Sequence, residues 1–416
     1  EIGSGLVGSE MCIRDSGRPS LGFTGNMDTY KPAEGSATRS DIAITDPDFK
    51  YPSLWKSNIA ADYKFGDGWV ATVELLYSKD INAIYHDNIG LYRTEQFVND
   101  GGAGNARPYY NGYYSDREGN QKAANHVVML RNTSKGHSLY TTFQLQKNFV
   151  DGILKGLYLN GSYSFGQSRG VTDGTSSVAT SAWKYRAALD GNAEEVGYTA
   201  GSFDGRLLLS ASYTANWSKY AATSFGLIYQ RYRPFRYSYC YNGDANGDSQ
   251  FSNDLMYIPA NFDEVKDHLL PGDFDSQEDA WKAMNAFIEQ DPYLSKHRGE
   301  YAERNGAVAP FANQLDLSVS HDIKIYQKNG RSHTLRFSFN IANFLNLLNR
   351  NWGVVQTTVL GNQQYQFLTI PKGQGPSAAN NYTLKYTMAK DLDETFKDNL
   401  NDVSRWQMQF GIKYIF

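Results

Sequence analysis

The sequence has few of the features that mark redox, metal–thiolate or helical membrane proteins. Only two cysteines occur among 416 residues, Cys12 and Cys240, and neither belongs to a CxxC pair, so no zinc or redox site is predicted. There is no run of about 18 apolar residues, so no transmembrane helix is expected. The net charge is −4 and Lys and Arg are scattered, which argues against nucleic acid as a partner.

Catalytic signatures are also missing from the sequence. The seven histidines show no HExxH or other metal spacing, and no nucleophile elbow or pair of catalytic carboxylates stands out. We therefore expect that the protein is not an enzyme.

Residues 1–16, EIGSGLVGSEMCIRDS, are unlike a secretion signal, because they have neither a long apolar core nor a small-residue cleavage site. They resemble the adapter-derived read-through found at the ends of assembled environmental sequences. We therefore expect residues 1–16 to be a non-native artefact and residues 17–416 to be part of a longer chain. A disulfide between Cys12 and Cys240 is not expected, since Cys12 belongs to that stretch.

What the sequence has is many aromatic residues and glycines, with 30 Tyr, 22 Phe and 38 Gly, arranged in segments of period two. In WKSNIAADYKF, one face carries Trp55, Ile59, Ala61, Tyr63 and Phe65, and a GDG turn leads to WVATVELLY. This alternation predicts a β-hairpin whose two faces differ in polarity. Nine such segments occur, at 55–65, 69–77, 138–149, 157–165, 207–217, 220–232, 315–325, 335–344 and 406–416.

The connections between these segments alternate strictly in length. Those after Phe65, Phe149, Trp217 and Ile325 are short, whereas the connections 96–125, 169–204, 242–311 and 346–402 are long. Outer-membrane barrels have short periplasmic turns and long outside loops, and their polar faces line a wet lumen. The sequence thus predicts an all-β fold, an antiparallel up-and-down transmembrane β-barrel with extracellular loops. A soluble β-sheet protein is the alternative.

Nine strands cannot close a conventional single-chain barrel, because bacterial barrels have even strand numbers. We therefore expect a C-terminal partial barrel of about nine strands. On this strand parity Phe416 lies at the periplasmic rim.

Four stretches carry a family resemblance: DINAIYHDNIGL, SNDLMYIPA, YLSKHRGEYAERNGAVAPFANQLDLSVSHD and NFLNLLNRNWGV. They resemble the Oar-like branch of TonB-dependent outer-membrane receptors of Bacteroidetes-type bacteria, over most of residues 40–416. The resemblance implies a Gram-negative outer membrane, uptake of an unknown extracellular ligand through a plugged barrel, and coupling to the TonB complex through an N-terminal part that this chain lacks. The alternatives are a structural or adhesive outer-membrane barrel and a passive porin.

The final strand is a candidate recognition element. Phe410, Ile412, Tyr414 and Phe416 alternate along it and end the chain in an aromatic. This pattern resembles the signal that the barrel-assembly machinery reads by strand addition. The alternative is a plain lipid-facing strand.

DANGDSQFSND is a candidate calcium loop. Asp244, Asn246 and Asp248 have the 1-3-5 spacing of oxygen ligands, and Asp254 adds a carboxylate. The match is imperfect, because Ser249 stands where an EF-hand has Gly and Leu255 where it has the bidentate Glu. The alternative is a polar surface loop with Asx turns.

Two further features lie in the long connections. Residues 276–290 predict one loop helix, capped by Ser276 and bearing an apolar stripe. The YYNGYY stretch offers Tyr109, Tyr110, Tyr113 and Tyr114 as a ligand-contact loop, since Tyr suits binding surfaces. Packing within the loop is the alternative for these tyrosines.

Overall fold

The computed structural model describes residues 41–102, 106–113, 126–174, 176–326, 332–361 and 364–416. The predicted artefact at residues 1–16, including Cys12, lies outside the described residues. None of the described helices is long and apolar enough to cross a membrane.

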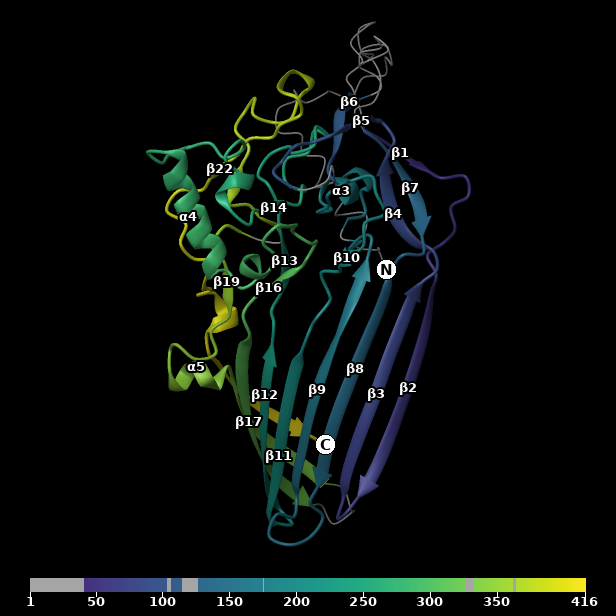
Figure 1. The fold of residues 1–416 in the computed structure, drawn as a ribbon. Coiled ribbons are helices and arrows are strands. Elements are labelled where there is room, and N and C mark those ends of the chain that lie inside the picture. The colour runs from purple at the N-terminus through teal and green to yellow at the C-terminus, as the bar shows by residue number, and fades with distance from the viewer. Residues whose placement is uncertain (1–40, 103–105, 114–125, 175, 327–331, 362–363) are drawn as a thin grey trace, which may run out of the picture.

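Nine long strands form one antiparallel sheet in which each strand pairs with its neighbours in chain order (Figure 1). All nine predicted strands are present, and the predicted all-β fold is confirmed. A two-residue strand, β10 (Gly197–Tyr198), extends the sheet beside β9. The order of the long strands is β2 (Leu54–Phe65), β3 (Trp69–Asp80), β8 (His137–Asn148), β9 (Leu157–Gly170), β11 (Arg206–Ser218), β12 (Ala221–Tyr232), β17 (Ala312–Tyr326), β18 (Ser332–Ala342) and β24 (Gln407–Ile415).

The register divides the main sheet into two faces of different polarity. One row of paired residues crosses five strands on what we call the apolar face: Tyr213, Phe225, Val319, Phe339 and Phe410. The next row crosses the same strands on the polar face: Thr214, Ser224, Ser320, Ser338 and Gly411.

Hydrogen bonds between strands satisfy part of the polar face. Thr142 and Ser164 are 2.9 Å apart, and Gln144 donates to Asn160 at 2.8 Å. The apolar face is exposed instead, with Phe225 at 41% and Phe410 at 66% relative accessibility. Among the described residues, the only buried apolar side chains on the nine long strands are Ala222, Ala312 and Ile341. The main sheet therefore has no apolar core of its own.

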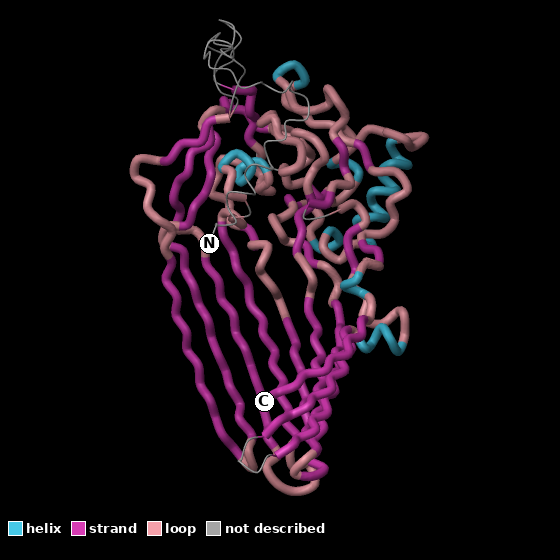
Figure 2. The backbone as a smooth tube through the Cα atoms, turned by 180° about the vertical axis from the view of Figure 1, so that it is seen from behind, coloured by secondary structure: helices cyan, strands magenta, loops and turns pink. Residues whose placement is uncertain are grey.

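Short and long connections alternate as predicted and lie at opposite ends of the sheet (Figure 2). The long connections are 81–136, 171–205, 233–311 and 343–406, and we call their described residues the loop layer. The first one begins well before the predicted residue 96, because β3 is followed directly by β4 (Ala83–Asn88) and β5 (Leu91–Phe97).

The loop layer contains small sheets of its own. In the first, β7 (Val127–Thr133) lies between β4 and β1 (Ile42–Thr45), a strand that precedes β2 and adds to the loop layer from outside the four connections. β5 pairs with β6 (Pro108–Tyr113). β13 (Arg236–Tyr239) lies between β16 (Ala307–Val308) and β20 (Gln364–Tyr365). The remaining pairs are β14 (Tyr257–Ile258) with β15 (Glu300–Tyr301), β19 (Gln356–Thr358) with β23 (Phe396–Asp398), and β21 (Leu368–Thr369) with β22 (Thr387–Met388).

The predicted helix is confirmed as α4 (Gln277–Gln290), where the Ser276 side chain accepts a hydrogen bond from the Asp279 amide. Its stripe of Ala280, Met284, Phe287 and Ile288 is buried. The prediction of a single loop helix is wrong, because α3 (Ala179–Lys184) and α5 (Phe344–Leu348) also form and are too short to show a helical period. The described residues also form the 3₁₀ turns η2 (Phe262–Glu264), η3 (Leu294–Lys296), η4 (Ala378–Asn380) and η5 (Asp402–Ser404).

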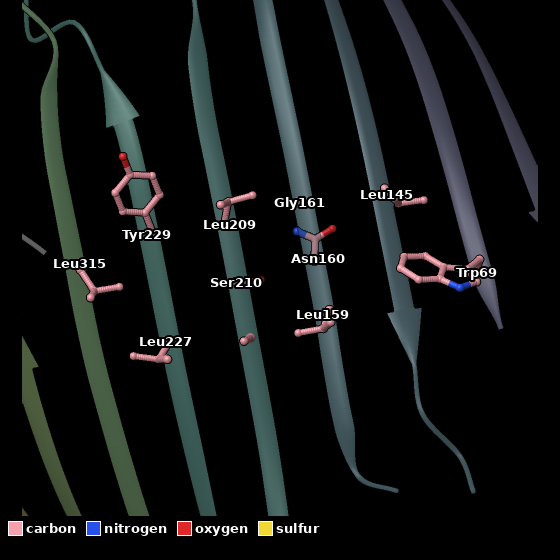
Figure 3. Close-up of a pocket in the computed structure, with 11 residues that line it drawn as sticks. Trp69, Leu145, Leu159, Asn160, Gly161, Leu209, Ser210, Leu227, Tyr229 and Leu315 are labelled. Carbon is pink, nitrogen blue, oxygen red and sulfur yellow. The ribbon is translucent and has the colours of Figure 1, made fainter. Parts of the chain in front are cut away.

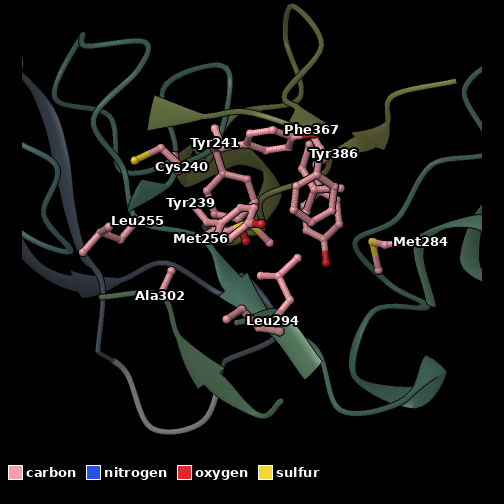
Figure 4. Packing of buried hydrophobic residues seen from close by; sticks show 14 of the residues in the cluster. Tyr239, Cys240, Tyr241, Leu255, Met256, Met284, Leu294, Ala302, Phe367 and Tyr386 are labelled. Atoms are coloured by element: carbon pink, nitrogen blue, oxygen red, sulfur yellow. The ribbon is translucent and has the colours of Figure 1, made fainter. Parts of the chain in front are cut away.

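The largest apolar core of the described chain lies in the loop layer (Figure 4). It joins aromatic side chains from the third and fourth long connections with the buried stripe of α4. Tyr239 and Phe367 rings are 5.9 Å apart, and Phe287 and Phe367 rings are 4.8 Å apart. The loop layer is thus a packed unit that rests on one end of an otherwise coreless sheet.

Candidate functional site

The structure brings the predicted calcium ligands together in the third long connection. The carboxylate oxygens of Asp244, Asp248 and Asp254 lie within 4.8 Å of one another. Asp248, Asp254 and Asn246 are buried and Asp244 is partly buried. These four residues form what we call the acidic cluster.

Local backbone geometry builds the cluster. The Asp244 carboxylate accepts hydrogen bonds from the amides of Asn246, Gly247 and Ser249, at 3.1, 2.6 and 2.8 Å. Ser249 has a φ of 67°, the left-handed conformation that favours glycine, so this position makes the sharp turn although it is a serine. Leu255 is 1% exposed and its backbone pairs with Cys240, so the twelfth position of the loop belongs to the core and supplies no carboxylate.

A buried arginine lies beside the cluster. The Arg107 guanidinium donates to Asp100 at 2.9 Å, to Asp254 at 3.2 Å and to the Leu255 carbonyl. Tyr301 donates its hydroxyl hydrogen to Asp100 at 2.7 Å. Because Arg107 and Asp100 belong to the first long connection and Asp254 to the third, these contacts join the two connections. We call Arg107, Asp100, Asp254 and Tyr301 the arginine network.

Burial dominates the electrostatics of the acidic cluster. It raises the pKa of Asp254 to about 7 even though Arg107 opposes the shift, and it raises the pKa of Asp248 well above the ordinary range. The nearby carboxylates of Asp244 and Asp254 raise the pKa of Asp248 further. One arginine cannot neutralise four carboxylates, counting Asp100.

A divalent cation would take the place of the protons that burial otherwise keeps on these carboxyl groups. Carboxylate and amide oxygens are the ligands that calcium prefers, so the donor set fits that ion. The Asn246 side-chain oxygen accepts from the Asp248 amide at 2.9 Å and keeps a second lone pair, so it can join the three carboxylates as a ligand. The calcium site stays a prediction.

The cluster borders a cavity of about 650 Å³ between the third and fourth long connections. Gly243, Asp244 and Phe251 line one side and residues 370–377 line much of the other. This cavity gives the loop layer a concave site beside a partly exposed carboxylate.

The structure buries the described tyrosines of the predicted ligand-contact loop. Tyr109, Tyr110 and Tyr113 are at most 9% exposed, while Tyr114 lies outside the described residues. The Tyr109 ring lies 4.7 Å from that of Tyr382, and Tyr110 donates to Asp190 at 2.7 Å. Their burial favours packing within the loop layer over ligand contact, because rings inside a core cannot meet a ligand at the surface.

The final strand presents its predicted residues on one face. Phe410, Ile412, Tyr414 and Phe416 are 66%, 62%, 57% and 91% exposed, and they share the apolar face with Phe339 of β18. β24 pairs with β18 on one side and with no described strand on the other. Both an assembly signal and a plain lipid-facing strand fit this arrangement.

Arg107, Asp100 and the wall at residues 370–377 were not found from the sequence. Arg107 and Asp254 are 147 positions apart, so no local spacing links them. A buried ion pair between distant loops leaves no periodic signal of the kind that revealed the strands.

Comparison with known proteins adds no relative, since no family model, curated protein or solved structure matches the chain. The class is therefore defined by the fold: an all-β protein in which a nine-stranded antiparallel sheet carries a packed loop layer at one end.

Proposed function

We propose that this chain is the C-terminal barrel part of a TonB-dependent outer-membrane receptor, with the loop layer outside the cell. The observation that carries the proposal is the exposed apolar face, which crosses all nine long strands in register. In water, each large apolar side chain left exposed forgoes roughly 1.5–3 kcal/mol of burial free energy. A hydrocarbon environment removes that penalty, while the polar face lines a wet lumen.

The two open edges of the main sheet support the same proposal. β2 and β24 are the two ends of the strand order in the described residues. Unpaired backbone groups in lipid cost several kcal/mol each, so a membrane sheet has to close. We infer that strands of the complete protein, beyond those described, pair with these two edges.

Capture of an extracellular ligand is assigned to the loop layer. Its aromatic core and arginine network fix the walls of the cavity beside Asp244, and a preformed concave site reduces the entropy cost of binding. Energy coupling through TonB rests on the resemblance and needs an N-terminal plug region. Assembly into the membrane is assigned to β24.

A structural or adhesive barrel is the second candidate function, and the packed loop layer favours it equally. A rigid outer surface serves contact with another cell or matrix as well as it serves uptake. The complete gene separates the two candidates. A plug and TonB box upstream support transport, whereas a gene that lacks both supports the adhesive function.

Adjacent residues of β17 test the membrane assignment. Val319 and Ser320 lie at nearly the same depth of the sheet on opposite faces. In the complete protein, Val319→Arg is expected to cost about 2–4 kcal/mol if it meets the bilayer interior, and so to reduce the folded fraction in the outer membrane. Ser320→Arg faces the lumen and is expected to cost far less.

The readout is heat-modifiable migration of outer-membrane extracts on gels. If both variants assemble like the unchanged protein, the apolar face does not meet lipid and the proposal fails. A complete protein that stays soluble without detergent contradicts it as well.

A further inference from the structure

A shallow groove of about 410 Å³ crosses the apolar face of the main sheet (Figure 3). Its side chains come from six neighbouring strands, β3, β8, β9, β11, β12 and β17. Five strand spacings of about 4.8 Å make the groove roughly 24 Å long. The apolar residues that line it are Trp69, Leu145, Leu159, Leu209, Ala211, Leu227, Tyr229 and Leu315.

Small residues in two neighbouring rows create the hollow. Gly161 lies between Leu145 and Leu209 in one row, and Ala211 lies between Leu159 and Leu227 in the next. A Cβ atom built on Gly161 would lie 3.0 Å from Cδ2 of Leu209. A larger side chain at Gly161 would therefore occupy the groove. Rows elsewhere on the face carry bulky side chains, such as Phe225, Val319 and Phe339.

A lysine stands at one end of the groove. Lys147 pairs with Trp69 on one side and Leu159 on the other, so it shares the apolar face with them. Its ammonium nitrogen lies 5.1 Å from the Trp69 ring centre and 4.7 Å from that of Phe149. No described carboxylate forms an ion pair with Lys147. It lies next to the short turns, because β8 ends at Asn148 and β3 begins at Trp69.

We propose that this groove binds one bilayer phospholipid, with its acyl chain over Gly161 and Ala211 and its headgroup phosphate at Lys147. The proposal rests on the proposed function, since the apolar face must meet the bilayer. A lysine beside a tryptophan is the combination expected at a membrane interface, where the ammonium reaches the headgroups and the ring lies at their level. The unpaired positive charge complements a phosphate, and the apolar hollow complements a hydrocarbon chain.

The test measures retention of phosphatidylglycerol by the purified complete protein, using native mass spectrometry in detergent with added lipid. The unchanged protein is expected to retain one lipid more tightly than the rest. Lys147→Gln is expected to weaken that lipid about tenfold, the factor for loss of one charge-assisted hydrogen bond. Gly161→Leu is expected to abolish tight retention by filling the groove.

Lys219→Gln is the matched control. Lys219 is another lysine at the short-turn end, with its nitrogen 4.8 Å from the Tyr220 ring centre, and it lies away from the groove. Heat-modifiable migration of each variant verifies folding. If Lys219→Gln weakens retention as much as Lys147→Gln, or if Gly161→Leu keeps the tight lipid, the groove is not the site and the proposal is overturned.

Two other outcomes separate this proposal from the proposed function. A protein that carries exchangeable lipids but no tight one contradicts only the groove. A protein that binds no lipid and needs no detergent contradicts the membrane assignment itself. Dimers that dissociate in Gly161→Leu would assign the groove to a second copy of the chain and overturn the lipid assignment.

Discussion

At the residue scale, Arg107 joins two of the long connections through buried ion pairs. Its guanidinium is fully buried, between Asp100 and Asp254. Removal of one partner of a buried ion pair costs about 3–5 kcal/mol, because the remaining charges lose their compensation. We therefore expect Arg107→Met to lower the stability of the loop layer by this amount. Hydrogen exchange of β6 and residues 240–258 measures the effect.

Arg93→Met provides the matched control for Arg107→Met. Arg93 donates to Asp190 at 3.1 Å, and its side chain is 53% exposed. The Asp190 side chain is 9% exposed and also accepts from the Tyr110 hydroxyl and the Asn192 amide. Water can replace the exposed Arg93, and the two other hydrogen bonds remain, so this variant is expected to lose only about 1 kcal/mol, much less than Arg107→Met. Equal losses of stability in the two variants would mean that the stability contributed by Arg107 does not depend on its burial.

The acidic cluster gives a second prediction at the residue scale. The double variant Asp244→Ala with Asp248→Ala is expected to lower the melting temperature only when calcium is present. Free calcium at a hundred times its dissociation constant would contribute about 2.7 kcal/mol of stability to the unchanged protein. Thermal unfolding with calcium, and again with chelator, measures the difference.

Asp263→Ala is the control for the calcium prediction, since Asp263 lies in the same long connection with its side chain 86% exposed. It is expected to change nothing in either condition. An equal loss with chelator in the double variant would remove the ion from the explanation. The loss would then be assigned to the amide hydrogen bonds that Asp244 accepts.

These two sites show why residues were predictable to different degrees. Asp244, Asn246 and Asp248 alternate within one loop, so their spacing alone brings their oxygens together. Arg107 depends on a chain path that returns after more than a hundred residues, which no local pattern encodes. The tyrosines at 109–113 were identified by composition, and composition does not distinguish a buried ring from one at a binding surface.

At the element scale, the question for β24 is whether it is an assembly signal or a plain membrane strand. Both Phe416 and Phe339 lie toward the apolar face, but only Phe416 belongs to the residues of the candidate assembly signal. If β24 is the proposed assembly signal, deletion of Phe416 is expected to reduce the amount of folded protein in the outer membrane several-fold, because recognition by strand addition uses the side chains of that strand. Phe339→Ala removes a similar ring from β18 and is expected to cause a smaller reduction in folded outer-membrane protein. Quantification of the heat-modifiable band provides the comparison.

A similar loss in both variants would assign β24 an ordinary lipid-facing role. A larger loss for Phe339→Ala would contradict the signal altogether. Total protein levels must be measured alongside, since unassembled barrel proteins are subject to proteolysis.

Elements were predictable where their side chains repeat over many residues. All nine long strands alternate over nine residues or more, and α4 repeats its apolar stripe from Ala280 to Ile288. β14, β15, β21 and β22 have two residues each, too few for any period. Tertiary partners create such strands, as when Tyr257 pairs with Tyr301 across the third long connection.

At the whole-molecule scale, the distribution of apolar residues is the reverse of that in a soluble β-sandwich. The buried core lies in the connections, and the sheet exposes its apolar face. The sequence could indicate the location of the loop layer only through strand parity. The alternation of short and long connections places all the long connections at the same end of the sheet. The packing inside the loop layer could not be predicted, because most of it joins residues from different connections.

Strand parity also predicts which parts of the protein face outward. Lys372 is exposed in the fourth long connection and Lys219 is exposed in a short turn, so the two lie at opposite ends of the sheet. A membrane-impermeant maleimide should label Lys372→Cys in intact cells that express the complete protein, and should label Lys219→Cys only after the outer membrane is permeabilised. Residues 17–416 contain one other cysteine, Cys240, which is fully buried, so it should not react. Labelling of Lys219→Cys alone in intact cells would invert the proposed orientation. Equal labelling of both would mean that no membrane separates the two ends, because the same reagent then reaches either position freely.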